Sequence, residues 1–226
     1  MNPNILQQIE RGALVENVLD EITAAIVTGR LLPGDKLVEI EVGKQLGVSR
    51  GPVREAIRRL EQLGLIEKIP YRGAFVASLT VDDVRELHDL REPLEGLAAR
   101  LVAERQDPKA VAHLEGIVAQ MRDSPPGTDR AKMVTLDADF HDSLINFSSH
   151  KLLQELWMIV GARLRTFLAL KTERLYDTPR EAAALHEPLV AAIAAGDAAA
   201  AERAARRHVA EAGRQHVLDW RDAYPD

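Results

Sequence analysis

The stretch GVSRGPVREAIRRLEQLGLI, residues 47–66, contains a helix start, an apolar stripe and four arginines. Ser49 is a typical N-cap residue, and Pro52 is tolerated in the first turn of the helix that follows. Gly64 is typical of the residue that ends such a helix. The apolar positions between them recur at helical spacing: Val53, Ala56, Ile57, Leu60 and Leu63. The stretch therefore predicts an amphipathic helix with one buried face.

The residues before this stretch predict two more helices. Apolar residues recur at helical spacing over 14–28, and Gly29 marks the end of that helix. The turn LLPGDKL, residues 31–37, precedes a short helix over 39–46, which ends at Gly47. Two short helices joined by a tight glycine turn form a helix-turn-helix.

The residues after the stretch predict a β-hairpin. The strand-like segments LIEKI, 65–69, and AFVAS, 74–78, flank PYRG, 70–73. A helix-turn-helix followed by such a hairpin is a winged helix.

Three arginines of the third helix lie on one face. Arg50, Arg54 and Arg58 are spaced by four, away from the apolar stripe, while Arg59 sits to one side. The guanidinium group is planar, always charged and able to bond at two places, which suits phosphates and the O6/N7 edge of guanine. These arginines are therefore candidate DNA contacts.

The alternative is an ordinary solvated face, with Glu55 and Glu61 as surface partners of the arginines. The helix-turn-helix before this face and the wing after it favour DNA contact. Arg72, beside Gly73 at the wing tip, is a second candidate, because glycine lets the backbone approach a phosphate or the minor groove closely.

The segments LLPGDKL, GVSRGPVREAIRRLEQLGLI and YRGAFV resemble the DNA-binding domain of GntR-type bacterial transcription regulators. The resemblance implies a dimer on a palindromic operator, with Arg50 and Arg54 as the main base and phosphate contacts. It also implies that Ser49 helps to position the backbone and that Gly73 reaches the minor groove. Ile40 stands where the family often has a basic residue, so a contact from the second helix is expected to be missing.

Composition limits the class of protein. With 226 residues, 46% of them hydrophobic, the chain can build one large domain or two of ordinary size. Without cysteine it has no disulfide framework and no thiolate metal site, and no amino-terminal apolar run marks it for secretion or a membrane. We therefore expect a cytoplasmic protein with no membrane partner.

The net charge of −6 is unevenly distributed. Residues 1–77 carry ten Lys/Arg and ten Asp/Glu, whereas residues 78–226 carry nineteen and twenty-five. The acidic balance therefore does not exclude DNA binding by the first half. The first half is also rich in glycine and proline turns, while the second is rich in alanine and leucine. We place a domain boundary near Ser78 to Thr80, with a winged helix-turn-helix domain over 1–78 and a second domain over 79–226.

The second domain is expected to be an all-α helical bundle. Apolar residues recur at helical spacing over 81–105, and Asp107 and Pro108 interrupt the pattern before a helix that runs to about Arg122. The remaining helices are expected near 129–148, 151–174, 179–195 and 198–219. The predicted fold is thus mainly α, with a small two-stranded β wing in the first domain.

Four residues of this domain are candidate metal ligands. Asp137 and His141 are four apart and share a helix face, although an ordinary surface ion pair has the same spacing. His186 and His208 lie on two helices that a turn at Gly196 makes antiparallel, and their distances from the turn could place them side by side.

The motifs D-x-x-F-H, L-H with A-I-A-A-G-D, and A-x-R-R-H resemble the FCD effector-binding domain of the FadR subfamily of GntR regulators, over residues 81–220. The resemblance implies a divalent metal bound in the bundle core by the four residues Asp137, His141, His186 and His208. Three imidazoles and a carboxylate suit zinc, nickel or a similar ion, and an open position would accept water or a ligand oxygen.

Arg91 matches an arginine of the same family pattern and is a candidate for pairing with a ligand carboxylate. The alternative is a salt bridge to Glu95, four residues on. Arg163 and Arg165 are further effector-binding candidates, one of which is expected to face outward. The other histidines are expected at the surface: His88, His113 and His216.

Together these patterns predict a homodimeric transcription regulator, a repressor, controlled by a small carboxylate or sugar acid bound at the metal. Two alternatives stay open. One is a metal-dependent hydrolase that carries a DNA-binding module, although no dedicated general base stands out: Asp142 and Glu187 only follow ligands in sequence. The other is a regulator for which the metal ion itself is the signal.

Overall fold

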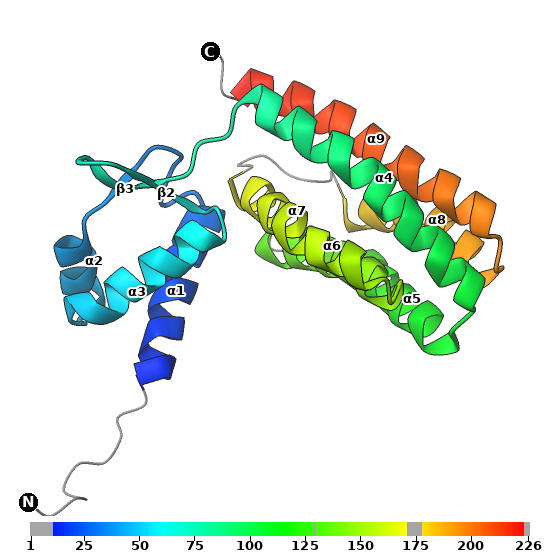
Figure 1. Ribbon diagram of the computed structural model, residues 1–226, viewed down its shortest axis with the longest axis horizontal. Coiled ribbons are helices and arrows are strands. Elements are labelled where there is room, and N and C mark those ends of the chain that lie inside the picture. Colours follow the sequence, from blue (N-terminus) through cyan, green and yellow to red (C-terminus); the bar gives the residue numbers. More distant parts are fainter. Residues whose placement is uncertain (1–10, 129, 171–177, 224–226) are drawn as a thin grey trace, which may run out of the picture. The chain divides into compact units, whose positions relative to one another are not determined.

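The computed structural model of the chain describes residues 11–128, 130–170 and 178–223. The chain divides into two compact units, Met1–Ser78 and Leu79–Asp226, here called the first and second units (Figure 1). The described part is mainly helical with one small sheet, which confirms the predicted fold class.

The first unit is built on three helices, α1 (Arg11–Val27), α2 (Glu39–Leu46) and α3 (Arg50–Gln62). Helix α1 packs on α3, and the apolar stripes predicted for both helices are buried. The buried positions that they contribute are Val18, Ile22, Ala25 and Ile26 from α1, and Val53, Ala56, Ile57 and Leu60 from α3.

A tight glycine turn joins α2 to α3. Gly47 takes a left-handed φ of 67°, and its N–H donates to the carbonyl of Gly43. Gly43 is buried, and a Cβ on it would lie 2.9 Å from the Val48 carbonyl oxygen. The close approach of α2 to α3 therefore needs glycine at this position.

The sheet has three antiparallel strands in the order β1-β3-β2: β1 (Lys36–Leu37), β2 (Ile66–Ile69) and β3 (Gly73–Val76). In the hairpin, Ile66 pairs with Val76 and Ile69 with Gly73. The predicted two-stranded wing is thus correct but incomplete. Strand β1 has only two residues, too few to show the alternation that marks a strand.

The second unit is a bundle of six helices within the described residues: α4 (Val81–Arg105), α5 (Pro108–Asp123), α6 (Arg130–Phe147), α7 (Lys151–Leu170), α8 (Pro179–Ala194) and α9 (Ala198–Ala223). Figure 1 shows α4 and α9 side by side, and α5 packs against α8. Small residues allow the α4–α9 approach, since a Cβ on Gly213 of α9 would lie 2.8 Å from Cβ of His88 on α4.

The helix ends follow from local side chains. A capping box starts α4, where the Thr80 hydroxyl accepts from the Asp83 N–H and the Asp83 carboxylate accepts from the Thr80 N–H. Between α8 and α9, Gly196 takes a φ of 69° and Asp197 Oδ1 accepts from the Ala200 N–H at 2.9 Å. This turn makes α8 and α9 antiparallel. None of the helices in the described ranges is long and apolar enough to cross a membrane.

Candidate nucleic-acid interface and metal centre

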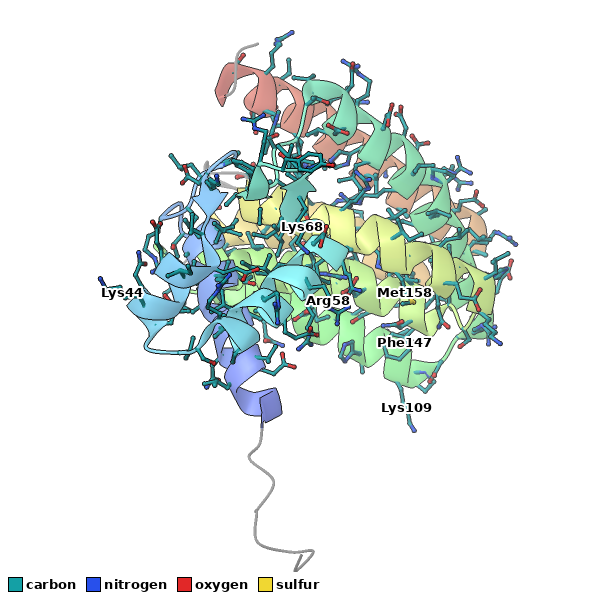
Figure 2. The ribbon with its side chains drawn as sticks, turned by 60° about the vertical axis from the view of Figure 1, so that its left-hand side comes forward. Lys44, Arg58, Lys68, Lys109, Phe147 and Met158 are labelled. Carbon is teal, nitrogen blue, oxygen red and sulfur yellow. The ribbon has the colours of Figure 1, made fainter. Side chains whose placement is uncertain are left out.

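The arginines of α3 reach solvent. Arg50, Arg54 and Arg58 are all exposed, on the side of the helix away from its buried stripe. Arg58 is labelled in Figure 2. Arg50 lies 3.4 Å from Glu39 Oε2, and Arg58 makes a two-point contact with Glu55, at 3.0 and 2.5 Å. At Arg50 and at Arg58, a phosphate would therefore compete with a carboxylate. Arg54 lies between these two arginines on the same face of the helix.

Ser49 is at the N-cap of α3 with an extended backbone, but its hydroxyl makes no capping hydrogen bond. Pro52, the third residue of the helix, has no N–H to donate, so the cap has lost one of its two usual donors. The predicted cap is therefore right in position and wrong in its hydrogen bond. The Ser49 side chain is exposed beside Arg50.

At the wing, two cations lie over one aromatic ring. Arg72 Cζ is 5.6 Å and Lys36 Nζ is 5.7 Å from the centre of the Phe75 ring. Gly73 has a φ of 114°, which glycine adopts without strain. The wing tip thus carries positive charge beside an exposed glycine.

In the second unit, three buried imidazoles converge from three helices. His141 on α6, His186 on α8 and His208 on α9 have ligand atoms that all lie within 4.8 Å of one another. The rings of His186 and His208 are 4.4 Å apart, as the turn at Gly196 predicts. The structure thus brings together residues that are distant along the chain.

Asp137 completes this cluster. Its carboxylate oxygens lie 3.8 Å from His141 Nε2 and 3.6 Å from His186 Nε2. Two ligands bound at about 2.1 Å to a tetrahedral ion stand roughly 3.4 Å apart. The two Asp137 distances would therefore shorten by a few tenths of an ångström on binding zinc, and the imidazoles, whose ligand atoms are up to 4.8 Å apart, would move closer together. Three imidazoles and one carboxylate are also a donor set that zinc or nickel accepts.

Two of the imidazoles are held in the orientation that a metal needs. His186 Nδ1 is 2.7 Å from the Ala182 carbonyl oxygen, and His141 Nδ1 is 2.6 Å from Glu95 Oε2. An N–H on each Nδ1 donates to these oxygens, which leaves a lone pair on each Nε2. The lone pair of His141 Nε2 accepts from Arg91 at 3.1 Å, and a metal ion would replace that hydrogen bond. Glu95 was not identified by the sequence patterns as part of this site.

The protonation states also suit metal binding, which requires neutral imidazole. Burial lowers the pKa of His186, and Asp137 offsets part of that shift. Burial, together with His186 and His141, lowers the pKa of His208 well below its ordinary value. Burial raises the pKa of Glu95, but Arg91 and His141 outweigh burial and hold that pKa well below its usual range.

Arg91 is buried beside this cluster. Its Nε donates to Glu95 Oε1 at 2.7 Å, and its NH2 group lies 3.1 Å from His141 Nε2. Both alternatives for this residue are therefore compatible with its position: it forms the salt bridge with Glu95 and also borders the candidate ligand site.

Arg163 and Arg165 are not brought to the cluster. Both are exposed on α7, and Arg165 pairs with Asp142 at 2.8 Å. The expectation that one of them faces the cavity is not met, because the inward positions of this part of α7 are taken by Leu164, Phe167 and Leu168.

Comparison with known proteins follows the same division of the chain. Residues 14–76 match the bacterial regulatory proteins of the gntR family, and residues 86–211 match the FCD domain. The chain belongs to the GntR family. It is a DNA-binding transcription regulator of the group that carries an FCD domain.

This GntR-family chain is 35% identical over 205 residues to the "Probable D-xylose utilization operon transcriptional repressor" of Paenarthrobacter nicotinovorans, covering 90% of the chain and 89% of the relative. It is 28% identical to the HTH-type transcriptional repressor RspR of Escherichia coli (strain K12), over 86% and 88%. Among solved structures, a transcriptional regulator GntR from Rhodococcus sp. RHA1 matches with a TM-score of 0.72 and 25% identity, covering 94% of the chain and 99% of that structure.

The members of this family are transcription regulators, not enzymes, so the hydrolase alternative is dropped. The contacts of the GntR-family chain agree with this. Asp142 accepts from Trp157 Nε1 at 2.6 Å as well as from Arg165, and Glu187 lies 3.4 Å from Arg122. Both carboxylates are engaged away from the imidazoles.

One expectation about histidines in this regulator is wrong. His88 and His216 are buried rather than exposed, with His216 Nδ1 3.1 Å from His88 Nε2. They meet because α4 and α9 pack closely, and Phe167 of α7 lies against both rings. His113 is exposed as expected.

Proposed function

We propose that this GntR-family regulator is a repressor whose operator affinity is set by a small organic acid bound at a divalent metal ion. The metal would be held by Asp137, His141, His186 and His208, and zinc or nickel suits these ligands. The observation that supports this proposal is the convergence of three buried imidazoles on one carboxylate.

The acid would bind beside Arg91. A divalent ion with an open position accepts a ligand oxygen, and a guanidinium group pairs with a carboxylate at two points. Arg91 lies 3.1 Å from His141 Nε2, so an acid bound at the metal would be within its reach. A carboxylate or sugar acid therefore fits this site. The relative named for D-xylose utilization makes sugar acids the first compounds to test.

The operator would contact α3 and the wing. Arg50 and Arg54 would make base and phosphate contacts in the major groove, and Arg58 would reach a phosphate after releasing Glu55. Ser49, Arg72 and Gly73 would contact the backbone and the minor groove. Relatives that are named repressors support repression as the outcome of binding. An operator-bound role also supports the expected cytoplasmic location.

A palindromic operator requires two copies of the chain, and α7 offers a surface for the second copy. Leu152, Leu156 and Ile159 are 59%, 46% and 65% exposed and lie one above another at spacings of four and three. Exposed Met158 (Figure 2) extends the apolar surface. Glu155 and Arg163 flank this stripe, so an antiparallel second α7 would place the glutamate of one copy near the arginine of the other.

The acid would act by preferring one arrangement of the two DNA-binding units. It can change operator affinity only by the difference in its binding to the two arrangements, typically about 1–3 kcal/mol, or roughly 5- to 150-fold. Half-sites must face the two winged helices in register, so small displacements of the units suffice to weaken binding.

The deciding experiment measures operator affinity and metal content together. We expect metal-loaded wild-type protein to change its operator affinity roughly 5- to 150-fold with the correct acid, and metal-free protein not to respond. His208→Ala should lose metal and the response, while the control His113→Ala, an exposed histidine, should keep both. An acid response in metal-free protein would refute the metal as anchor. A shift caused by metal alone would identify the ion as the signal.

A further inference from the structure

The tip of the wing is a tight turn with a tyrosine in an unfavourable position. The Arg72 N–H donates to the Ile69 carbonyl at 3.0 Å, which closes the turn, and Pro70 is its second residue. Tyr71, the third residue, has a φ of 65°. Turns of this kind favour glycine or asparagine at the third position, because a Cβ there is strained. Tyr71 therefore costs stability relative to glycine.

Packing within the first unit does not offset this cost. Tyr71 is 109% exposed, more than any other large hydrophobic residue in the described part of the chain. Phe75, a few residues on, is partly buried and lies under Lys36 and Arg72. The tyrosine ring thus stabilises neither the wing nor the core, and a binding role would account for its presence.

The surroundings of Tyr71 indicate what it binds. It lines a groove of about 640 Å³ together with Arg50 at the start of α3, and with Lys36 and Lys68 of the sheet. Glu39 pairs with Arg50 and Glu61 with Lys68, which leaves the charge of Lys36 to attract phosphate to this groove. The same groove therefore links the wing tip to the first arginine of the proposed DNA-contacting helix.

We propose that Tyr71 is a contact residue for the backbone of duplex DNA. Its ring would pack on a deoxyribose, and its hydroxyl would donate a hydrogen bond to a phosphate oxygen. An apolar ring with a polar tip matches a sugar next to a phosphate, and such contacts fix the position of a protein on the duplex. The inference rests on the proposed placement of operator DNA against α3 and the wing, and does not depend on the metal or the acid.

The test compares operator affinity with fold stability in the full-length protein. The DNA is a palindromic duplex that the wild-type protein selects from a random library. Tyr71→Gly and Tyr71→Asn should melt at or above the wild-type temperature, because both residues tolerate the turn. Both should nevertheless bind the duplex about 5- to 30-fold more weakly. Tyr71→Phe, which lacks only the hydroxyl, should lose about 2- to 10-fold.

Affinity for an unrelated duplex should fall by the same factor, because a backbone contact carries no sequence information. Wild-type affinity in Tyr71→Gly and Tyr71→Asn would overturn the proposal, and so would a joint loss of affinity and melting temperature, which would indicate a structural role. A loss confined to the selected duplex would also overturn it, since Tyr71 would then contact bases.

Arg54→Ala, measured on the same duplex, separates this inference from the proposed position of α3. If Arg54→Ala binds normally while the Tyr71 variants lose affinity, the contact proposed for Arg54 is wrong and the Tyr71 contact stands. If Arg54→Ala loses affinity and the Tyr71 variants do not, the Tyr71 contact is wrong.

Discussion

Nδ1 of His141 lies 2.6 Å from Oε2 of Glu95, and both side chains are buried. The other oxygen of the same carboxylate accepts from Arg91 Nε at 2.7 Å. One buried negative charge therefore orients a proposed metal ligand and balances a buried cation. These three side chains, from α4 and α6, form one polar network in which the loss of one member leaves the others without compensation.

Glu95→Gln keeps the shape of the side chain and removes its charge. Arg91 would then be a buried cation without its ion-pair partner, and the free energy of unfolding should fall by about 3–5 kcal/mol. The neutral amide also replaces the carboxylate that holds the His141 ring through Nδ1 and makes Nε2 a better donor to a metal. Metal affinity should therefore fall about 10- to 100-fold. Urea denaturation and metal titration measure the two effects.

A matched control for this substitution is Glu104→Gln. Glu104 accepts from Arg100 at 2.9 Å with both side chains well exposed, so its loss should change the free energy of unfolding by less than about 0.5 kcal/mol. Equal effects of the two substitutions would contradict the network assigned to Glu95.

Metal-free protein should lose stability as the pH falls below about 6.5. Burial lowers the pKa of His186, and lowers that of His208 further below its ordinary value with help from the neighbouring histidines. The unfolded chain takes up protons at these positions near pH 6.5 and the folded chain does not. The free energy of unfolding is therefore highest above that pH, and below it should fall by about 1.4 kcal/mol per pH unit for each histidine.

Denaturation of metal-free protein at about pH 7.5, 6.5 and 5.5 measures this slope. His208→Asn, which removes one of the titrating groups, should have a shallower profile. Equal stability of the wild-type protein at the two lower pH values would show that the histidines accept protons within the fold.

The sequence predicts part of the histidine cluster, because local features determine it. Gly196 and Asp197 end one helix and begin the next, so His186 and His208 are expected at matching heights of an antiparallel pair. Glu95 could not be found in this way. Its contact with His141 spans 46 positions and depends on how α4 packs against α6, which no local pattern records.

The same limit explains the other differences. Lys36 and Leu37 form a strand only because they pair with β3. His88 and His216 are 128 positions apart in the sequence, and they are buried only because α4 and α9 approach closely.

Tyr71 is a different case, because its turn is predictable from PYRG. Glycine is the residue that local rules favour at the third position of this turn, and the chain has tyrosine there. The local preference thus fails at a place where we infer a contact with DNA.

Arg54→Ala should weaken specific operator binding by about 1–3 kcal/mol and leave the metal content unchanged. Arg54 is exposed on α3, so its truncation should not disturb the fold. If the contact is to a phosphate, the dependence of log affinity on log salt should also become shallower by about one. Fluorescence anisotropy at several salt concentrations measures both.

Arg59→Ala is the control for this prediction, because Arg59 lies to one side of the α3 face and pairs with Glu16 at 2.7 Å. It should keep near-wild-type operator affinity. A larger loss in Arg59→Ala than in Arg54→Ala would mean that another face of α3 meets the DNA.

Ile159→Glu should convert the proposed dimer into a monomer without unfolding it. Ile159 is 65% exposed in the single chain, so the substitution removes little buried surface, yet in a twofold interface it places two charges in the apolar stripe of α7. Leu218→Glu, on the 44% exposed position of α9, is the control and should remain dimeric. Sedimentation equilibrium measures the mass of each variant, and titration with operator DNA measures its affinity. A monomer should lose most of its affinity for the palindrome and retain binding to a half-site. An Ile159→Glu protein with the mass of a dimer would place the interface on a different surface.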